Sequence, residues 1–266
     1  MSTDTTRRWI PLEGAANARD VGGVPLAGGG AVPAGRLLRA DNLQDLTERD
    51  VALLVSELGL RAVIDLRTGV EVAREGPGPL TRRPEVIVEH RSLYPETGGQ
   101  TDFDLETISP WGRLERHPTD ADESPTVQAY LGYLRRRPDS VVAAIRTIAT
   151  PPDGGAVLVH CAAGKDRTGV VLALALDAVG VRREEVVADY LATRERIDAL
   201  VARLAASPTY ADEVRVEDTA SHAPREGTME RVLELLDERQ GGSAGWLLEH
   251  GLGEDGLAAL RARLGG

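Results

Sequence analysis

This chain of 266 residues contains only one cysteine and few aromatic residues. A single cysteine excludes an intramolecular disulfide framework and leaves one free thiol, Cys161, which suits a reducing compartment. Aromatic residues make up 3% of the chain, so the core must be built mainly from Leu, Val, Ala and Ile. The chain is nevertheless long enough to bury a full core.

The chain also lacks an excess of positive charge and a long apolar run. Its formal net charge of −11 at pH 7 argues against nucleic acid or an anionic membrane surface as the general partner. The longest apolar stretch, 170–179, is interrupted by Asp177 and is too short to span a bilayer. The first eight residues are polar and do not resemble a secretory signal. We therefore expect a cytoplasmic protein without membrane insertion.

Strand-like and helix-like segments alternate up to residue 160, and only helix-like segments follow. Strands are predicted at 61–66, 86–93 and 156–160, and helices at 47–58, 70–75, 126–136, 139–149, 167–179, 182–191, 193–206, 228–239, 243–249 and 254–264. Residues 1–35 are predicted to be mostly loop, and residues 94–125 form an irregular acidic segment. The pattern predicts one α/β domain over residues 1–266, with helices on both faces of a short, parallel-rich sheet and a helical C-terminal part at 192–266.

The cysteine lies between an apolar, strand-like stretch and an Ala- and Leu-rich, helix-like stretch. A strand, a tight turn and a helix N-terminus point backbone N–H groups and the positive end of the helix dipole at one place. Such a place binds anions and favours the thiolate form of a cysteine. Arg167, six residues after Cys161, carries a planar fork of donors that can hold two phosphoryl oxygens. We predict Cys161 as a nucleophile and Arg167 as the charge clamp of a phosphoryl-transfer site.

The residues between and beside these two are predicted to bind the phosphate. Gly164 allows a turn that a side chain would obstruct, and the N–H groups of 162–167 are expected to line the anion site. Lys165 adds a second positive charge, Thr168 can hydrogen-bond the thiolate, and His160 is expected to hold the loop geometry. The predicted phosphate-binding set is Ala162, Ala163, Gly164, Lys165, Asp166, Arg167 and Thr168.

The stretch HCAAGKDRTG at 160–169 resembles the signature loop of the cysteine-dependent protein-tyrosine phosphatases, in the form typical of a bacterial atypical family. Further similar stretches are NARD at 17–20, GRLLRA at 35–40, AVIDLRT at 62–68 and VADYL at 187–191. The resemblance implies a protein-tyrosine-phosphatase-like α/β fold and hydrolysis of phosphotyrosine, and possible activity on phosphoserine, phosphothreonine or phosphoinositides, through a phospho-cysteine intermediate. It also implies that the helices after Leu191 cover the pocket as a lid.

The general acid that protonates the leaving oxygen is not fixed by these motifs. The wider superfamily uses an aspartate on a separate loop. Glu96 follows Pro95 where the mycobacterial member that typifies the family has Pro-Asp, and Asp102 and Asp104 are rivals. Asp166, inside the signature loop, is a fourth candidate, as a proton donor or as a base that positions water. Each of the four also has a structural interpretation, because Asp166 can tether the loop or pair with Lys165 and the others can be solvated loop acids.

The remaining matching positions are predicted to be structural. Asp65 and Arg67 are expected to form a buried ion pair or tether beneath the loop, and Asn17, Arg19 and Asp20 to shape the backbone. The other histidines show no spacing typical of a metal site, so neither a metal nor an organic cofactor is expected.

The predicted protein is a phosphomonoester hydrolase whose partner is a phosphorylated protein or a small-molecule phosphate. An alternative within the enzymes is a sugar, nucleoside or inositol phosphatase. A phospho-ligand binder without catalysis is the third interpretation, but such a protein would not need the thiolate of Cys161.

Overall fold

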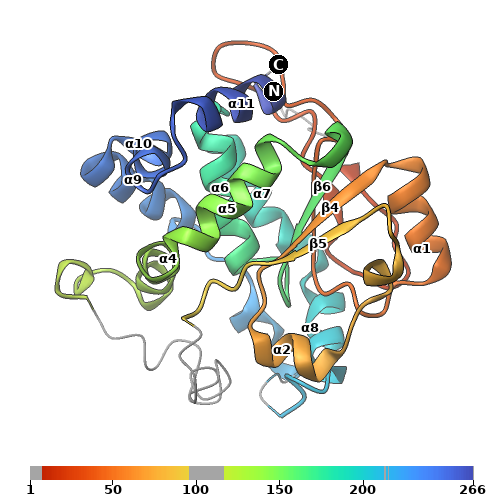
Figure 1. Ribbon diagram of the computed structural model, residues 1–266. Coiled ribbons are helices and arrows are strands. Elements are labelled where there is room, and N and C mark those ends of the chain that lie inside the picture. The colour runs from red at the N-terminus through yellow and green to blue at the C-terminus, as the bar shows by residue number, and fades with distance from the viewer. Residues whose placement is uncertain (1–7, 96–116, 213, 215, 266) are drawn as a thin grey trace, which may run out of the picture.

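A six-stranded sheet forms the centre of the computed structural model, which describes residues 8–95, 117–212, 214 and 216–265 (Figure 1). Its strands lie in the order β1-β2-β3-β6-β4-β5. Their bounds are Arg8–Trp9 (β1), Arg19–Asp20 (β2), Leu37–Ala40 (β3), Leu60–Asp65 (β4), Ile87–His90 (β5) and Ala156–His160 (β6). β3, β6, β4 and β5 are mutually parallel, whereas β1 and β2 add an antiparallel edge. The predicted α/β fold with a short, parallel-rich sheet is therefore confirmed.

Alternate residues of the central strands face two separate cores. In β6, Val157 and Val159 belong to the larger core, whereas Ala156 and Leu158 belong to the smaller one. All five residues of β6 are buried, as expected for a parallel strand that is covered on both faces.

The larger core is covered by helices of the second half of the chain. These are α4 (Pro125–Arg136), α5 (Pro138–Ala149), α6 (Asp166–Ala178), α7 (Arg183–Leu191), α9 (Thr228–Gln240), α10 (Gly242–Glu249) and α11 (Glu254–Leu264). α1 (Glu48–Ala52), which continues as a π-helical turn at Leu53–Glu57, and the 3-10 helix Pro79–Arg82 cover the smaller core. α2 (Gly69–Glu75) and α8 (Ile197–Ala206) lie beyond the carboxyl ends of the strands, in the lower part of Figure 1. Further 3-10 helices are at Pro118–Asp120, Pro152–Gly154, Ala192–Arg196 and Val216–His222.

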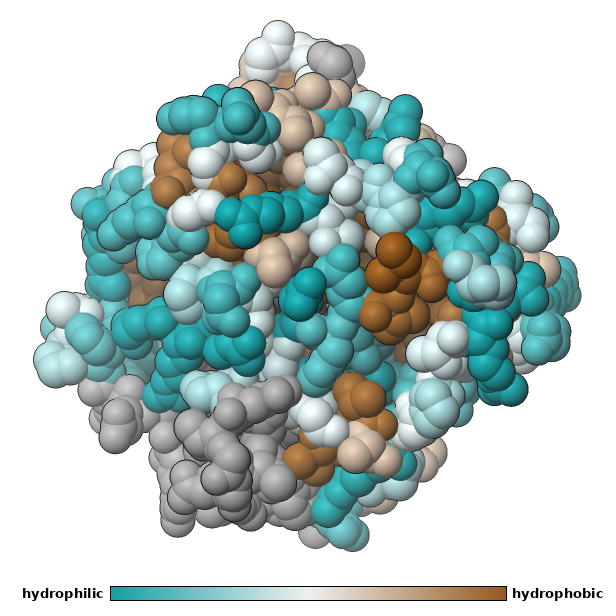
Figure 2. Space-filling model, viewed as in Figure 1, coloured by the Kyte–Doolittle hydropathy of each residue, from teal (hydrophilic) through white to brown (hydrophobic). Residues whose placement is uncertain are grey.

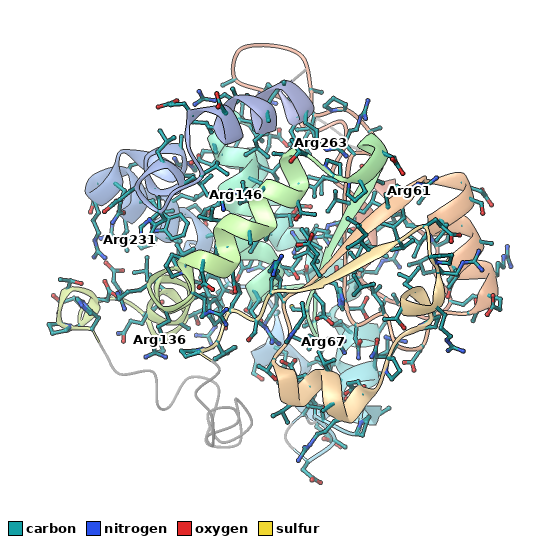
Figure 3. All side chains as sticks on the ribbon, in the orientation of Figure 1. Arg61, Arg67, Arg136, Arg146, Arg231 and Arg263 are labelled. Atoms are coloured by element: carbon teal, nitrogen blue, oxygen red, sulfur yellow. The ribbon has the colours of Figure 1, made fainter. Side chains whose placement is uncertain are left out.

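Arginine side chains join surface segments that are distant in the sequence. Arg231 of α9 binds Glu123 at 2.8 Å, Arg263 of α11 donates to the Gly154 carbonyl at 3.2 Å, and Arg146 of α5 donates to the Gly251 carbonyl (Figure 3). Contacts of this kind are exposed to solvent, so they contribute little to stability. The viewed face is mostly hydrophilic, with small, separate hydrophobic patches (Figure 2). Within the described ranges, no helix is long and apolar enough to cross a membrane.

The predicted elements differ from the observed ones mainly at the beginning of the chain. Residues 1–35 were expected to be mostly loop, but 8–9 and 19–20 are short strands, and β3 was not predicted at all. β3 escapes a pattern search because its sequence is Leu-Leu-Arg-Ala and the arginine, Arg39, is buried like its neighbours. The helix predicted at 193–206 is divided into a 3-10 turn, Ala192–Arg196, and α8.

Candidate active site

The carboxyl ends of three parallel strands meet where the predicted nucleophile lies. His160 at the end of β6 pairs in register with Ala40 of β3 and with Asp65 of β4. Cys161 follows directly, and α6 begins at Asp166, so the expected order of strand, tight loop and helix is present. Cys161 is only 2% exposed, which places its thiol at the floor of the site.

The carbonyl groups of this loop are held by donors from other segments. The Asn42 N–H donates to the Ala162 carbonyl at 3.0 Å, and Asn17 Nδ2 donates to the Ala163 carbonyl at 3.0 Å. In a trans peptide the C=O and the following N–H point in opposite directions. The N–H groups that follow these carbonyls are therefore turned away from the donors, which is the arrangement that an anion-binding loop requires.

Gly164 is required in this loop for two reasons. Its φ of +62° lies in the left-handed region that side chains disfavour, and a Cβ atom there would approach the Ala40 carbonyl oxygen to 2.2 Å. Its own carbonyl accepts a hydrogen bond from Arg39 Nη2 at 2.6 Å and one from Asn17 Nδ2 at 3.3 Å. The absence of a side chain thus lets the loop lie directly against β3.

A buried ion network supports the loop from below. Asp189 of α7 binds Arg19 Nε at 2.9 Å and also binds Arg39. Burial raises the pKa of Asp189, but the charges of Arg19 and Arg39 and the hydrogen bonds from them lower it to about 2 overall. The stretches NARD, GRLLRA and VADYL, which lie apart in the sequence, therefore meet at one structural network.

His160 points into a second buried network, behind the loop. Arg67 and Asp65 form a bidentate ion pair, with Nη2 to Oδ2 at 2.6 Å and Nε to Oδ1 at 2.9 Å. His160 Nε2 lies 3.6 Å from Asp65 Oδ1, and burial lowers the pKa of His160 to about 4. Figure 3 shows Arg67 between β4 and α2. The residues fit the predicted buried ion pair.

Arg167 is held by a carboxylate that the sequence reasoning missed. Its Nη1 and Nη2 bind Glu71 Oε2 and Oε1 at 2.6 and 2.9 Å, which is a bidentate pair. Glu71, 1% exposed, lies in the first turn of α2, where Thr68 and Glu71 form a reciprocal capping box. Burial raises the pKa of Glu71, but the charge and hydrogen bonds of Arg167 and other hydrogen bonds bring it below its usual range. The pair therefore stays ionised at neutral pH.

A pocket of about 240 Å³ opens above Cys161. The loop contributes five further lining residues: Ala162, Ala163, Lys165, Asp166 and Arg167. α8 covers another side with four aliphatic residues: Ile197, Leu200, Val201 and Leu204. Tyr94, Tyr133 and Tyr210 complete most of the remaining wall, with Val214 and His222. The pocket therefore has a charged floor and an apolar roof.

Three of the five tyrosines of this aromatic-poor chain line the pocket, and the other two, Tyr130 and Tyr190, lie behind Asp166. Tyr94 and Tyr133 pack edge to face, with ring centroids 5.4 Å apart. The Tyr130 hydroxyl donates to Asp166 Oδ1 at 2.5 Å and lies 3.0 Å from the Tyr190 hydroxyl. Burial raises the pKa of Tyr130 well above its usual value, so Tyr130 remains a donor to Asp166.

The second cation of the loop is engaged with two oxygens. Lys165 Nζ donates to the His222 carbonyl at 2.6 Å and lies 3.5 Å from Asp166 Oδ2. The first contact joins the loop to the end of the 3-10 helix Val216–His222. Asp166 thus faces the pocket between a tyrosine hydroxyl and a lysine.

Most of the predicted site residues gather at this pocket. Gly164 and Thr168 support the loop without lining the cavity, and Thr168 Oγ1 is buried without a hydrogen-bond partner in the described part of the chain. Glu96, Asp102 and Asp104, the other candidates for the general acid, lie outside the described residues. Among the residues described, no group of three or more His, Cys, Asp or Glu side chains is arranged to hold a metal ion.

Sequence reasoning missed Glu71 and the tyrosines because each reaches the site from a remote segment. A signal for Glu71 was available, since Thr68-x-x-Glu71 after a buried strand is a capping box at the carboxyl edge of the sheet. The composition offered a signal for the tyrosines, because this aromatic-poor chain has five tyrosines but only one phenylalanine.

Comparisons with known proteins agree with this geometry. The model of the tyrosine phosphatase family matches residues 10–266. The triple specificity protein phosphatase PtpB of Mycobacterium tuberculosis is 34% identical over 210 residues, which cover 73% of this chain and 72% of that protein. A tyrosine-protein phosphatase of Nostoc commune is 31% identical over 248 residues, which cover 88% of this chain and 76% of that protein.

Proposed function

We propose a substrate and a mechanism for this chain, which belongs to the tyrosine phosphatase family and is a phosphatase. It hydrolyses aryl phosphomonoesters, above all phosphotyrosine, through a phospho-cysteine intermediate. The observation that carries the proposal is the pocket in which Cys161, Arg167 and Asp166 lie beneath an apolar and aromatic wall. The charged floor suits a phosphoryl group, and the wall suits the ring that carries it.

In the first step, the thiolate of Cys161 attacks phosphorus, and the bond from phosphorus to the phenolic oxygen breaks. Asp166 donates its proton to that oxygen, so that a neutral phenol leaves. Arg167 and the N–H groups of the loop bind the three equatorial oxygens, where negative charge is concentrated in the transition state. Glu71 holds the guanidinium in place through its bidentate pair.

In the second step, Asp166 takes a proton from water, which attacks phosphorus while the bond from sulfur to phosphorus breaks. Inorganic phosphate and the Cys161 thiolate result. The hydrogen bond from Tyr130 and the nearby ammonium of Lys165 support the position of Asp166 in both steps. Glu96, Asp102 and Asp104 remain rivals for the first proton transfer, since each of them is also a carboxylic acid.

The shape of the pocket supports aryl phosphates over sugar or inositol phosphates. The nucleophile is almost fully buried, and the side of α8 that faces it is aliphatic. A phenyl ring extends far enough from a peptide backbone to bring phosphorus to such a floor, and it buries apolar area on the way. The hydroxyls of a sugar or inositol would instead lose hydrogen bonds to water against this wall.

The test is phosphate release from p-nitrophenyl phosphate and from a panel of phosphotyrosine, phosphoserine and phosphothreonine peptides, phosphoinositides and sugar phosphates. We expect the highest kcat/KM for aryl substrates and no turnover by Cys161→Ser. Activity that survives in Cys161→Ser would overturn the mechanism. A preference for one small metabolite would favour the metabolic alternative.

Two variants identify the proton donor. Asp166→Asn should lower kcat on phosphopeptides and abolish the fall of the rate at high pH, because that fall reports the loss of the acid proton. Glu96→Gln should leave this basic limb unchanged. The reverse result would transfer the role from Asp166 to Glu96.

A further inference from the structure

Glu71 binds two parts of the molecule at once. Its Oε1 accepts a hydrogen bond from Arg167 Nη2 at 2.9 Å and another from the Tyr210 hydroxyl. Tyr210 belongs to residues 197–210, which comprise α8 and the turn after it, and which we call the cover because α8 forms the aliphatic wall of the pocket. One carboxylate oxygen thus joins the cover to the arginine on the floor.

The cover is attached to α2 at a second point that does not involve Arg167. Ser207 Oγ and Thr209 Oγ1 each donate to Glu75 Oε1 at 2.6 Å. Glu75 lies one helical turn after Glu71, so both carboxylates project from the same face of α2. α2 therefore holds the cover with two similar attachments, and only one of them reaches Arg167. Arg203 of the cover binds Asp41 and Asp45 separately.

The hydrogen bonds of Glu71 explain why this attachment affects the arginine. Oε2 accepts from the Thr68 N–H and from Arg167 Nη1, both at 2.6 Å, so four donors converge on the two oxygens. A carboxylate has about four acceptor positions, and a buried one is costly to leave short of a donor. Loss of the Tyr210 hydroxyl frees the carboxylate to rotate, and a bidentate guanidinium must rotate with it.

We propose that Tyr210 is a positioning residue for Arg167 that acts through Glu71, so that the seated cover and the oriented arginine stabilise each other. The inference rests on the proposed function of Arg167 as the phosphoryl clamp. Coupling of this kind is reciprocal. An oxyanion bound at Arg167 should hold the cover in place, and a cover that loses its Tyr210 contact should weaken the grip on the oxyanion.

Hydrogen exchange and kinetics on three proteins test this inference. They are the wild type, Tyr210→Phe, and a matched control, Ser207→Ala with Thr209→Val, which loosens the cover at Glu75 only. Exchange of the amides of 197–210 is measured with and without saturating orthovanadate, which mimics the phosphoryl group. Turnover of p-nitrophenyl phosphate gives kcat and KM for each protein.

In the wild type, orthovanadate should slow exchange in the cover by roughly tenfold, the equivalent of one hydrogen bond to a charged group. In Tyr210→Phe the slowing should shrink to less than about twofold, and kcat/KM should fall by roughly tenfold, mainly in kcat. The control should exchange faster overall but should keep the orthovanadate effect, with kcat within about twofold of the wild type.

Undiminished protection by orthovanadate in Tyr210→Phe would overturn the inference, because the cover would then respond through direct contacts in the pocket. An equal loss in the control would also overturn it. Failure of the proposed function has a different signature, since the wild type would then not turn over the aryl phosphate or Cys161→Ser would remain active.

Discussion

Replacing Glu71 by glutamine tests the idea that a remote carboxylate orients the phosphoryl clamp. The amide keeps the shape of the side chain but removes its charge and one acceptor group. Four donors converge on the carboxylate, whereas an amide offers one acceptor oxygen and brings two donors of its own. Whichever way the amide turns, its NH₂ group must face a donor from Arg167, Thr68 or Tyr210.

The magnitude follows from burial. Removing one partner of a buried ion pair costs about 3–5 kcal/mol, and an isosteric amide should fall near the lower end of this range. At 266 residues a loss of about 3 kcal/mol corresponds to roughly 5 °C in Tm. A misplaced charge clamp should also lower kcat/KM about 100-fold, the usual effect of losing one group that stabilises a transition-state oxyanion.

The assay combines urea unfolding with steady-state turnover of p-nitrophenyl phosphate. Glu75→Gln is the matched control, because it makes the same change one turn along α2. The Glu75 carboxylate binds Ser207 and Thr209, whereas Glu71 binds Arg167. We expect the control to keep most of its stability and activity. If Glu71→Gln and Glu75→Gln behaved alike in both measurements, the ion pair would not orient Arg167, and the reasoning would be refuted.

Three further substitutions test the support of the loop. Gly164→Ala should cost about 2–4 kcal/mol in urea unfolding and abolish turnover, because its Cβ would overlap the Ala40 carbonyl, whereas Gly28→Ala has open space and should be neutral. His160 has a folded pKa of about 4, below its usual 6.5, so the unfolded state binds more protons between these values. The wild type should lose roughly 3 kcal/mol relative to His160→Asn as the pH falls from 6.5 to 4, and a difference independent of pH would contradict this. Asp189→Asn should cost about 3 kcal/mol in urea unfolding, because two buried arginines lose their counter-charge, and an unchanged midpoint would show that the network is dispensable.

Local signals predicted the elements that carry the nucleophile. β6 has the predicted bounds and α6 begins one residue earlier than expected, since a buried apolar strand followed by an Ala- and Leu-rich helix is readable from adjacent residues. β3 could not be predicted from its own residues, because the groups that bind the buried Arg39 side chain are distant in the sequence. These groups, Asp189 and the Gly164 carbonyl, lie more than a hundred residues away. Buried charge in a strand becomes visible only when its partners are known.

The same distinction holds at the site. The gathering of Cys161, Lys165, Asp166 and Arg167 at one pocket was predictable, because they lie within seven consecutive positions of the sequence. The contacts that Glu71 and the tyrosines make there were not, since these residues come from α2, α4, α7, the cover and the segment after β5. Lys165 shows the limit of the motif, because its ammonium group binds the His222 carbonyl instead of standing in open solvent.

The acidity of the chain and the anionic substrate are compatible because the charges beside the loop differ from those of the whole molecule. Four cations adjoin or underlie the loop: Arg19, Arg39, Lys165 and Arg167. In the proposed first step they face three negative charges, the carboxylates of Asp189 and Glu71 and the thiolate of Cys161, because Asp166 then carries its proton. Exposed acids further than about 8–10 Å away are screened at physiological salt, whereas buried charges act through a medium of lower dielectric constant. The phosphate group of the substrate therefore meets one excess positive charge and a set of oriented N–H groups. The overall charge of −11 has little influence at the floor of the pocket.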